Sequence, residues 1–274
     1  VVNDAVYSRN RSIEEKYNVD ITQHLVTDPA GELNKTITAG DDIYDLALLV
    51  QNTITPIAQT GGLYDLYSLP YIDFDKPWWN AELNSRISIG GKLFFTTSDL
   101  MLVDKQRTFI LFMNRDMIRN YSLDNVYDLT REGLWTIDKM HAMCKTVSSD
   151  LDGDGVYTDL DQYGAGFEKY TFYVLTVASG NFIAGKDKED VPTISINTPR
   201  TISTIDKILT ITSDKTIMYF VEDFNGKVSY DYWGTAENMF YDGRILFISD
   251  FPQTLKLMSA NASIDYGIIP YPKY

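Results

Sequence analysis

Tyr44-Asp-Leu-Ala-Leu-Leu-Val50 is apolar almost throughout its length. Such a run suits a strand that is buried on both faces of a parallel sheet. Helices are expected on either side of it, from Pro29 to Ala39 and from about Thr53 to Gln59. An opening helix from Asn3 to Tyr17 and a short strand at residues 19–21 precede them. This alternation of helices and strands predicts an α/β fold with helices on the faces of a sheet.

The rest of the chain continues in the same style. A hairpin is expected from Arg86 to Phe95, turning at Gly90-Gly91, because paired glycines favour a tight turn. A helix opening at Thr198-Pro199 would place Ile202, Ile205 and Leu209 inward. Further strands are expected at residues 108–113, 163–167, 244–249 and 264–269, and further helices near residues 137–147, 171–178 and 235–243.

The composition excludes several classes of protein. The 274 residues carry a net charge of −14, which would repel nucleic acids and anionic membrane surfaces. Cys144 is the only cysteine, so neither a disulfide framework nor a multi-cysteine metal site is available. The aromatic content is high, with 19 Tyr, 13 Phe and 4 Trp. Most of these rings belong in a core, but so many can also line a sugar-binding cleft.

A second stretch, residues 150–161, has the spacing of a calcium-binding loop. Its aspartates fall at the first, third, fifth and twelfth positions, and Gly155 falls where the chain must turn sharply. The last position departs from the usual longer glutamate, and Gly164 and Gly166 argue against an exit helix. We therefore expect a lone structural calcium site, the alternative being an acidic turn that binds nothing. The expected ligands are Asp150, Asp152, Asp154, Val156, Thr158 and Asp161.

Ligands of open α/β sheets bind beyond the carboxyl ends of the strands, which selects five candidate residues. Gln51 and Asn52 follow the strand at residues 44–50 and would bind sugar hydroxyls or cap a helix. Asp99 follows the hairpin and would accept hydroxyl hydrogen bonds or remain a solvated charge. Tyr170 follows the strand at residues 163–167 and would stack on a sugar or pack structurally. Trp233 directly precedes a helix, where an indole can cover the apolar face of a pyranose.

No motif indicates catalysis. His24 and His141 are far apart, and the chain has no nucleophile elbow, phosphate-binding loop, dinucleotide fingerprint or zinc-protease motif. A glycoside hydrolase remains an alternative, because two carboxylates facing a cleft would suffice. The spacing of the 38 acidic residues singles out no such pair. A calcium-dependent carbohydrate-binding or adhesion module is a further alternative that rests on the aspartate loop alone. We predict binding without catalysis.

Short motifs along nearly the whole chain occur in a recognisable order. They include Tyr44-Asp-Leu46, Gly62-Leu-Tyr-Asp-Leu66, Lys76-Pro-Trp-Trp-Asn80, Phe112-Met-Asn114, Phe240-Tyr-Asp-Gly-Arg244 and Tyr266-Gly-Ile-Ile-Pro-Tyr-Pro-Lys273. With these motifs in this order, the chain resembles the extracellular solute-binding proteins of carbohydrate ABC importers, in particular the lipoprotein type of Gram-positive bacteria.

The resemblance implies a periplasmic-binding-protein-like fold with two α/β lobes joined by hinge strands. The lobes would be residues 1–108 and 109–262, with residues 263–274 returning to the first lobe. Such proteins usually have an earlier first strand and a longer C-terminal part, so we expect a fold that is incomplete at both termini. The resemblance also implies a monomer that binds a sugar or oligosaccharide and delivers it to a membrane permease. It would be extracellular, as a membrane-anchored lipoprotein, or periplasmic.

Overall fold

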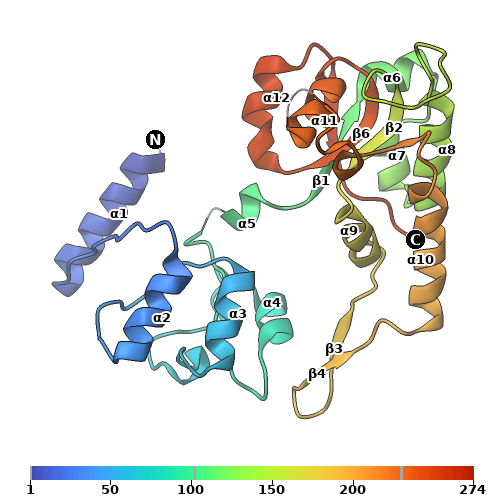
Figure 1. Ribbon diagram of the computed structural model, residues 1–274. Helices are drawn as coiled ribbons and strands as arrows, with labels where there is room; N and C mark the ends of the chain where they lie inside the picture. Colours follow the sequence, from blue (N-terminus) through green and yellow to red (C-terminus); the bar gives the residue numbers. More distant parts are fainter. Residues whose placement is uncertain (1, 102, 229–230) are drawn as a thin grey trace. The chain divides into compact units, whose positions relative to one another are not determined.

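The computed structural model describes residues 2–101, 103–228 and 231–274. The chain folds into two compact units (Figure 1). Unit 1 comprises Val1–Asp73 and Lys92–Thr96, and unit 2 comprises Phe74–Gly91 and Thr97–Tyr274. The lobe boundary that we expected after residue 108 therefore falls within unit 2. No helix among the described residues is both long and apolar enough to cross a membrane.

Unit 1 is built from helices. They are α1 (Val2–Tyr17), α2 (Pro29–Ala39), α3 (Gln51–Gln59) and the short 3-10 helix η1 (Leu66–Ser68). The bounds of α2 agree with the prediction because its end signals are local. Asp28 caps it by accepting a hydrogen bond from the backbone N–H of Gly31, and Gly40 ends it in the left-handed conformation at φ 72°.

The strands predicted at residues 19–21 and 44–50 are absent from the described structure. Three of the apolar side chains that suggested the second strand are exposed, with Leu46 at 69%, Leu48 at 57% and Val50 at 67%. A strand needs neighbours that pair with its N–H and C=O groups, and the described residues of unit 1 contain no strand that could do so. An apolar run alone therefore does not determine the sheet.

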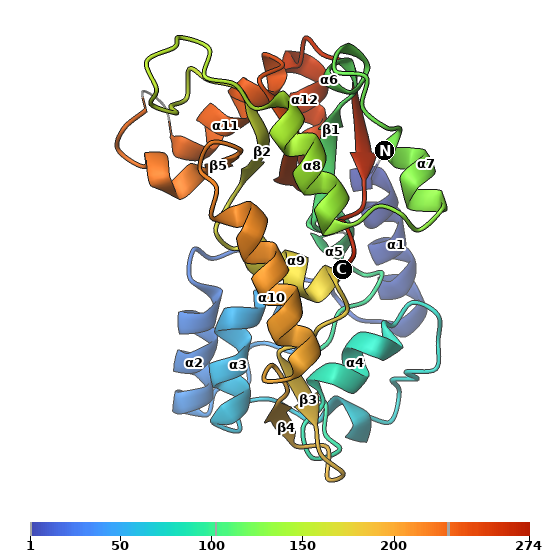
Figure 2. The ribbon, with the colours of Figure 1, turned by 90° about the vertical axis from the view of Figure 1, so that its right-hand side faces the viewer.

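Unit 2 contains a mixed sheet whose described strands have the order β5-β2-β6-β1-β7 (Figure 2). β2 pairs in parallel with β5 and β6, whereas β1 is antiparallel to β6 and β7. The carboxyl ends of β5, β2, β6 and β7 and the start of β1 therefore lie along one edge, here called the carboxyl edge. The strands are β1 (Ile110–Asn114), β2 (Tyr163–Phe167), β5 (Met218–Phe220), β6 (Ile245–Asp250) and β7 (Tyr266–Ile269).

The last strand differs from its expected place. β7 pairs with β1 inside unit 2, with Phe112 opposite Ile268, instead of returning to the first lobe. This pairing supplies hydrogen-bond partners to the edge of β1 that does not face β6, and it buries Ile269, which is 1% exposed. Residues 266–269 thus complete the sheet that carries the carboxyl edge.

Helices cover both faces of this sheet, as Figure 2 shows for α8 on one side and α11 and α12 on the other. Side chains alternate between two buried clusters, since Leu111 and Met113 belong to one and Phe112 to the other. The described helices of unit 2 as a whole are α4 (Ala81–Ile87), α5 (Val103–Gln106), α6 (Arg115–Asn120), α7 (Val126–Arg131), α8 (Ile137–Val147), α9 (Thr171–Ala178), α10 (Pro199–Thr212), α11 (Tyr232–Tyr241) and α12 (Leu255–Asn261), with the 3-10 helices η2 (Val221–Phe224) and η3 (Pro252–Thr254).

The prediction of a hairpin from Arg86 to Phe95 is wrong, although a turn does form at Gly90 and Gly91. Arg86 belongs to α4, and Gly90 and Gly91 have φ values of 59° and 72°. Their N–H groups each donate to Asp190, one to the backbone oxygen and one to the carboxylate, at 3.0 Å. Asp190 lies in a hairpin that we had not predicted, between β3 (Ala184–Lys186) and β4 (Pro192–Ile194).

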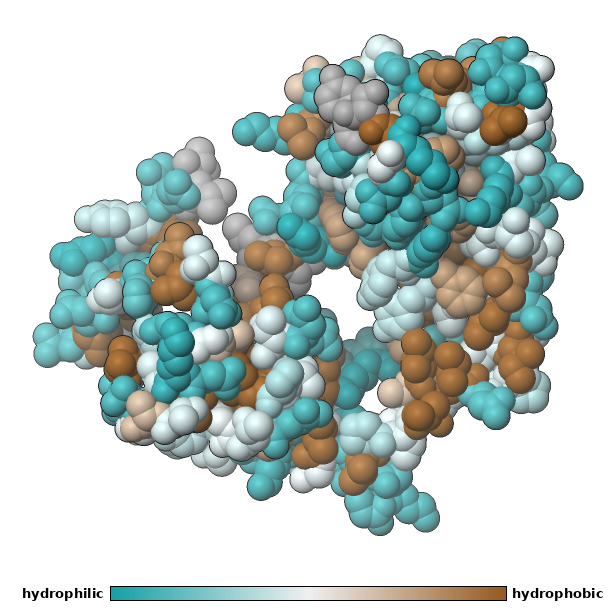
Figure 3. All heavy atoms as spheres, viewed as in Figure 1, coloured by the Kyte–Doolittle hydropathy of each residue, from teal (hydrophilic) through white to brown (hydrophobic). Residues whose placement is uncertain are grey.

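α10 forms as predicted but presents a different face to the core. Thr201, Thr204, Ile208 and Ile211 are buried, whereas Ile202 and Leu209 are exposed. Figure 3 shows hydrophobic surface over α10 and over the segment that leads to β3. Two threonines turn inward because Asn181 binds both of their hydroxyl groups. Buried hydrogen bonding therefore decides the orientation of this helix.

Candidate functional site

Three acidic residues lie at the carboxyl edge of unit 2. Glu168 follows β2, Glu222 lies in η2 directly after β5, and Asp250 is the last residue of β6. The three strands are parallel neighbours, so their carboxyl ends come together. Such an edge is where open α/β sheets bind ligands.

Asp250 is the most buried of these acids, with 3% of its surface exposed. Its Oδ1 accepts a hydrogen bond of 2.7 Å from the N–H of Phe251, but its Oδ2 is buried and has no partner among the described residues. Burial raises the pKa of Asp250, against the opposing effects of hydrogen bonds and the charge of Arg107. An unpartnered buried carboxylate oxygen is costly, so this atom favours the arrival of a donor.

Glu237, on α11, adds a fourth acidic group to the carboxyl edge. Burial raises the pKa of Glu237 to about 7, and the charges of Asp250 and Asp231 raise it further. A hydrogen bond from the side chain of Trp233 has the opposite effect. Since Trp233 and Glu237 are four residues apart on α11, they lie on the same helix face.

Trp233 lies in the first turn of α11. Asp231 caps this helix, and its Oδ1 accepts hydrogen bonds from the N–H groups of Trp233 and Gly234 at 3.1 Å and 2.7 Å. The indole is half-buried and packs against the buried cluster formed around Phe112 and Phe240. The cap and this packing together fix the ring beside Glu237.

Aromatic rings form a continuous strip at the same edge, here called the aromatic strip, made of Phe109, Tyr170, Tyr173 and Phe251. The Phe109 ring centroid lies 5.6 Å from Tyr170 and 4.6 Å from Phe251, and Tyr170 lies 5.3 Å from Tyr173. Tyr170 is 53% exposed, so its ring can still receive a ligand. The Arg107 guanidinium lies 5.7 Å from the Phe251 ring.

The structure thus places two of the predicted residues, Tyr170 and Trp233, on elements at the carboxyl edge. Gln51 and Asn52 belong to unit 1, where they are exposed at the start of α3. No side chain caps that helix at Val50, so the alternative role of helix capping is not supported by the hydrogen bonds there.

Asp99 lines a separate cavity within unit 2, of about 300 Å³. It forms an ion pair with Lys105 at 3.5 Å. Trp78 and Trp79, which we did not predict as site residues, line the same cavity, and Trp78 is 49% exposed. α5, which carries Lys105, packs against η3, which follows Asp250. The cavity is lined by Pro77, Trp78, Trp79, Asn80, Ala81, Thr97, Ser98, Asp99 and Lys105.

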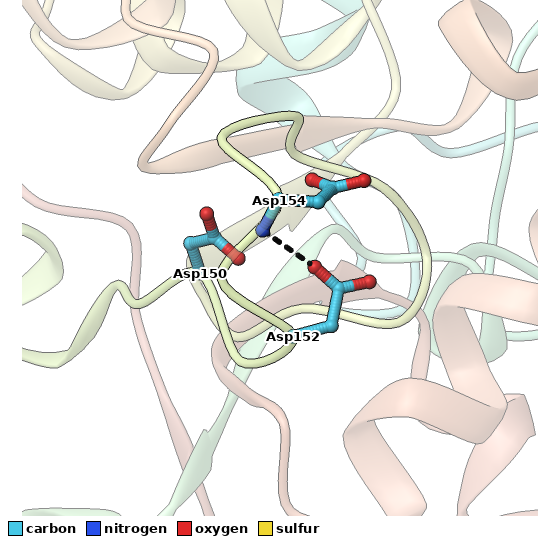
Figure 4. Close-up of side chains that lie close together, drawn as sticks. All are labelled: Asp150, Asp152 and Asp154. Carbon is cyan, nitrogen blue, oxygen red and sulfur yellow. Dashed lines mark hydrogen bonds between the residues drawn. The ribbon is translucent and has the colours of Figure 1, made fainter.

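The aspartate loop brings Asp150, Asp152 and Asp154 together (Figure 4). Each offers one carboxylate oxygen, and these oxygens lie within 4.8 Å of one another. Backbone hydrogen bonds shape the loop, since Asp150 accepts from Gly153 and Gly155 at 2.7 Å and 2.8 Å. Those bonds lower the pKa of Asp150. For Asp152 a backbone hydrogen bond lowers the pKa, but burial and the neighbouring acidic charges outweigh it and raise the pKa overall.

Asp161 has a different position from these three. It is fully buried, and its two carboxylate oxygens accept hydrogen bonds from the N–H groups of Leu151 and Thr158 at 2.8 Å and 2.7 Å. These bonds close the loop at its base. Val156, the expected carbonyl ligand, is exposed, and Thr158 also places its hydroxyl 3.4 Å from Asp161. The carboxylates that the loop brings together are therefore those of Asp150, Asp152 and Asp154.

Comparisons with known proteins identify the fold. No family model and no curated protein matches the chain. Solved structures do match: UspC of Mycobacterium tuberculosis has 13% identity and a TM-score of 0.63 over 99% of this chain and 66% of its own. The ABC substrate-binding protein Lmo0181 of Listeria monocytogenes in complex with cycloalternan has 17% identity and a TM-score of 0.54, covering 98% of this chain and 64% of its own. A cyclo/maltodextrin-binding protein complexed with maltotetraose has 16% identity and a TM-score of 0.61, covering 96% and 60%.

These matches confirm the predicted fold class, an α/β fold of the periplasmic-binding-protein type. The chain spans only 60% to 66% of the length of these three structures. At such low identities the likeness concerns the fold, and the residues at the carboxyl edge have to carry the functional argument.

Proposed function

We propose that the chain binds a saccharide at the carboxyl edge of unit 2 and is the substrate-binding component of an ABC importer. The observation that carries this proposal is the aromatic strip beside the acidic groups Glu168, Glu237 and Asp250. Exposed rings can cover the apolar face of a sugar, while carboxylates accept hydrogen bonds from its hydroxyl groups.

The matching structures support this proposal. Two of them are complexes with cycloalternan and with maltotetraose, and the GacH receptor of Streptomyces glaucescens, which also matches, has been solved in complex with acarbose. We propose that the bound saccharide is passed without chemical change to a membrane permease. An extracellular or periplasmic, monomeric protein, anchored as a lipoprotein, would suit that task.

A thermal-shift screen of mono- and oligosaccharides, with calcium present throughout, tests the proposal. We expect one or a few saccharides to raise the melting temperature by several degrees, because a ligand that binds only the folded state stabilises it. Mass spectrometry should recover every saccharide intact. A cleaved saccharide would instead favour the hydrolase, for which the raised pKa of Glu237 beside Asp250 would suit a general acid. A screen in which no saccharide changes the melting temperature would contradict the proposed function.

We also propose that Asp150, Asp152 and Asp154 bind a structural calcium ion. A cation among three neighbouring carboxylates removes their mutual repulsion, which the raised pKa of Asp152 reflects. We expect Asp152→Ala to lower the melting temperature in calcium but to leave it unchanged in chelator, and to leave saccharide affinity intact.

The matched control is Asp206→Ala, which removes an exposed carboxylate of α10 outside the loop. This variant should melt like the original protein in both conditions. If the original protein itself melts at the same temperature with calcium and with chelator, the calcium site is excluded.

A further inference from the structure

The acidic groups at the carboxyl edge have few cations to balance them. Within the described part of the chain, no lysine or arginine forms an ion pair with Glu168, Glu237 or Asp250. The neighbouring Lys169 is paired with Asp223 at 2.7 Å, and the exposed Arg107 lies over the Phe251 ring. The charge of Arg107 acts on Asp250, but none of the described cations pairs directly with the three acids, so the edge carries net negative charge.

Asp250 lies at the centre of this charge. It interacts electrostatically with Glu168 from the β2 side and with Glu237 from α11, and raises the pKa of both. Its buried Oδ2 has no hydrogen-bond partner among the described residues. A buried carboxylate that lacks a partner is stabilised most by a group that brings both a hydrogen-bond donor and positive charge.

Building on the proposed function, we propose that the saccharide carries a protonated amine, as an amino sugar does, which binds between Glu168, Glu237 and Asp250. An ammonium group offers three donors and one positive charge, whereas a hydroxyl offers one donor and no charge. A uronate, sulfate or phosphate would be repelled. The aromatic strip would then cover the ring of the sugar, so that charge at the amine and stacking on the ring select the ligand together.

The proposal makes the binding equilibrium depend on pH in a defined direction. Glu237 interacts with Asp231, the N-cap residue of α11, with Trp233 and Tyr241 on the helix itself, and with Asp250 on β6, the strand against which α11 packs. With a pKa of about 7 it is largely protonated in mild acid. An ammonium group favours the ionised carboxylate, so its binding releases a proton. Affinity for a ligand whose amine stays protonated should rise about tenfold between about pH 5.5 and about pH 7, because the free protein gains the ionised form over that range.

The test compares tetrasaccharides by isothermal titration calorimetry on the full chain. The β-1,4-linked tetramers of glucosamine, N-acetylglucosamine and glucose share one backbone and differ at a single ring position, and maltotetraose serves as a neutral α-linked probe. We expect the glucosamine tetramer to bind at least about tenfold more tightly than its N-acetylated counterpart at neutral pH. Its binding should release protons into the buffer, which the neutral tetramers should not do.

Variants show whether the amine is bound by a local contact with these acids or attracted by the negative charge of the whole protein. Glu168→Gln and Glu237→Gln keep the size of the side chain and should reduce the preference for the amine several-fold. Asp206→Asn removes an equal charge from an exposed position on α10 and should keep the preference. If the preference survives in both glutamine variants, the amine is attracted by the overall charge of −14 and the proposal fails.

The remaining outcomes are equally decisive. Binding of a neutral tetramer as tightly as the amine overturns the proposal and leaves the proposed function standing. Binding of none of the tetramers overturns the proposal, and the thermal-shift screen then decides the proposed function separately. A preference for the amine that is lost in the glutamine variants, together with proton release, supports both.

Discussion

Replacing Gly164 with alanine should destabilise unit 2 by about 3 kcal/mol, the upper end of the usual cost of overpacking a core. Gly164 lies in β2 directly beneath α8. An added Cβ would lie 2.2 Å from the Cβ, 2.4 Å from the Cα and 2.8 Å from the carbonyl oxygen of Cys144. Two of these atoms belong to the backbone, so a change of rotamer cannot relieve the clash. Either the helix moves away from the sheet or the strand shifts.

Urea denaturation measures this loss, and Gly185→Ala is the matched control. At Gly185 an added Cβ meets its nearest atom, the Cβ of Ser195, at 3.6 Å, which is ordinary contact. That variant should stay within about 1 kcal/mol of the original protein. The double variant Gly164→Ala with Cys144→Ala should remain unstable, because the backbone atoms of residue 144 are still there. Stability unchanged by Gly164→Ala would mean that α8 does not pack on β2 as described.

The same glycine illustrates what the sequence could reveal of the fold. Gly164 and Gly166 argued against a helix after the aspartate loop, and the segment is indeed the strand β2. Helix bounds were also predictable where local signals mark them. Thr136 caps α8 by accepting a hydrogen bond from the N–H of Lys139, and α8 begins and ends at the predicted residues.

Features that depend on distant parts of the chain could not be predicted in this way. The run at residues 44–50 has the composition of a buried strand, but composition does not supply the neighbouring strand that would pair with it. The hairpin expected at residues 86–95 was predicted from its paired glycines, but the actual partner of those glycines is Asp190, about a hundred residues away in the sequence. In both segments, hydrogen bonding to distant parts of the chain, and not the local conformational preference of the residues, determines the structure.

In the candidate site, too, some residues could be predicted from local sequence and others could not. The rule that ligands bind at carboxyl ends of strands selected Tyr170, and Glu168 was within its reach, since it directly follows β2. Asp250 was also within its reach, because it directly follows the strand predicted at residues 244–249. Glu237 carried no such signal, because only the packing of α11 on β6 brings it near Asp250. Sequence could name single rings and acids, whereas the convergence of the acidic groups required the sheet order.

Trp233→Ala should weaken saccharide binding at least about tenfold, a loss of about 1.4 kcal/mol, without unfolding the protein. The indole supplies a rigid face for a sugar ring, and its side chain donates the hydrogen bond that lowers the pKa of Glu237. The variant removes both. Calorimetry with the saccharide found in the thermal-shift screen measures the loss, and circular dichroism establishes that the variant remains folded. An unchanged Kd would remove Trp233 from the site.

Two further variants separate the two roles of the indole. Trp233→Phe keeps an aromatic face but has no N–H to donate, and Glu237→Gln keeps an acceptor for that N–H but has no charge. If Trp233 acts by stacking, Trp233→Phe should retain most of the affinity and Trp233→Ala should lose it. If it acts by holding Glu237 in the ionised form, Trp233→Phe should bind as weakly as Trp233→Ala at pH 6. The affinity of both variants should then return at higher pH. Loss of the hydrogen-bond donor raises the pKa of Glu237, but the carboxyl group still ionises once the pH exceeds the raised pKa.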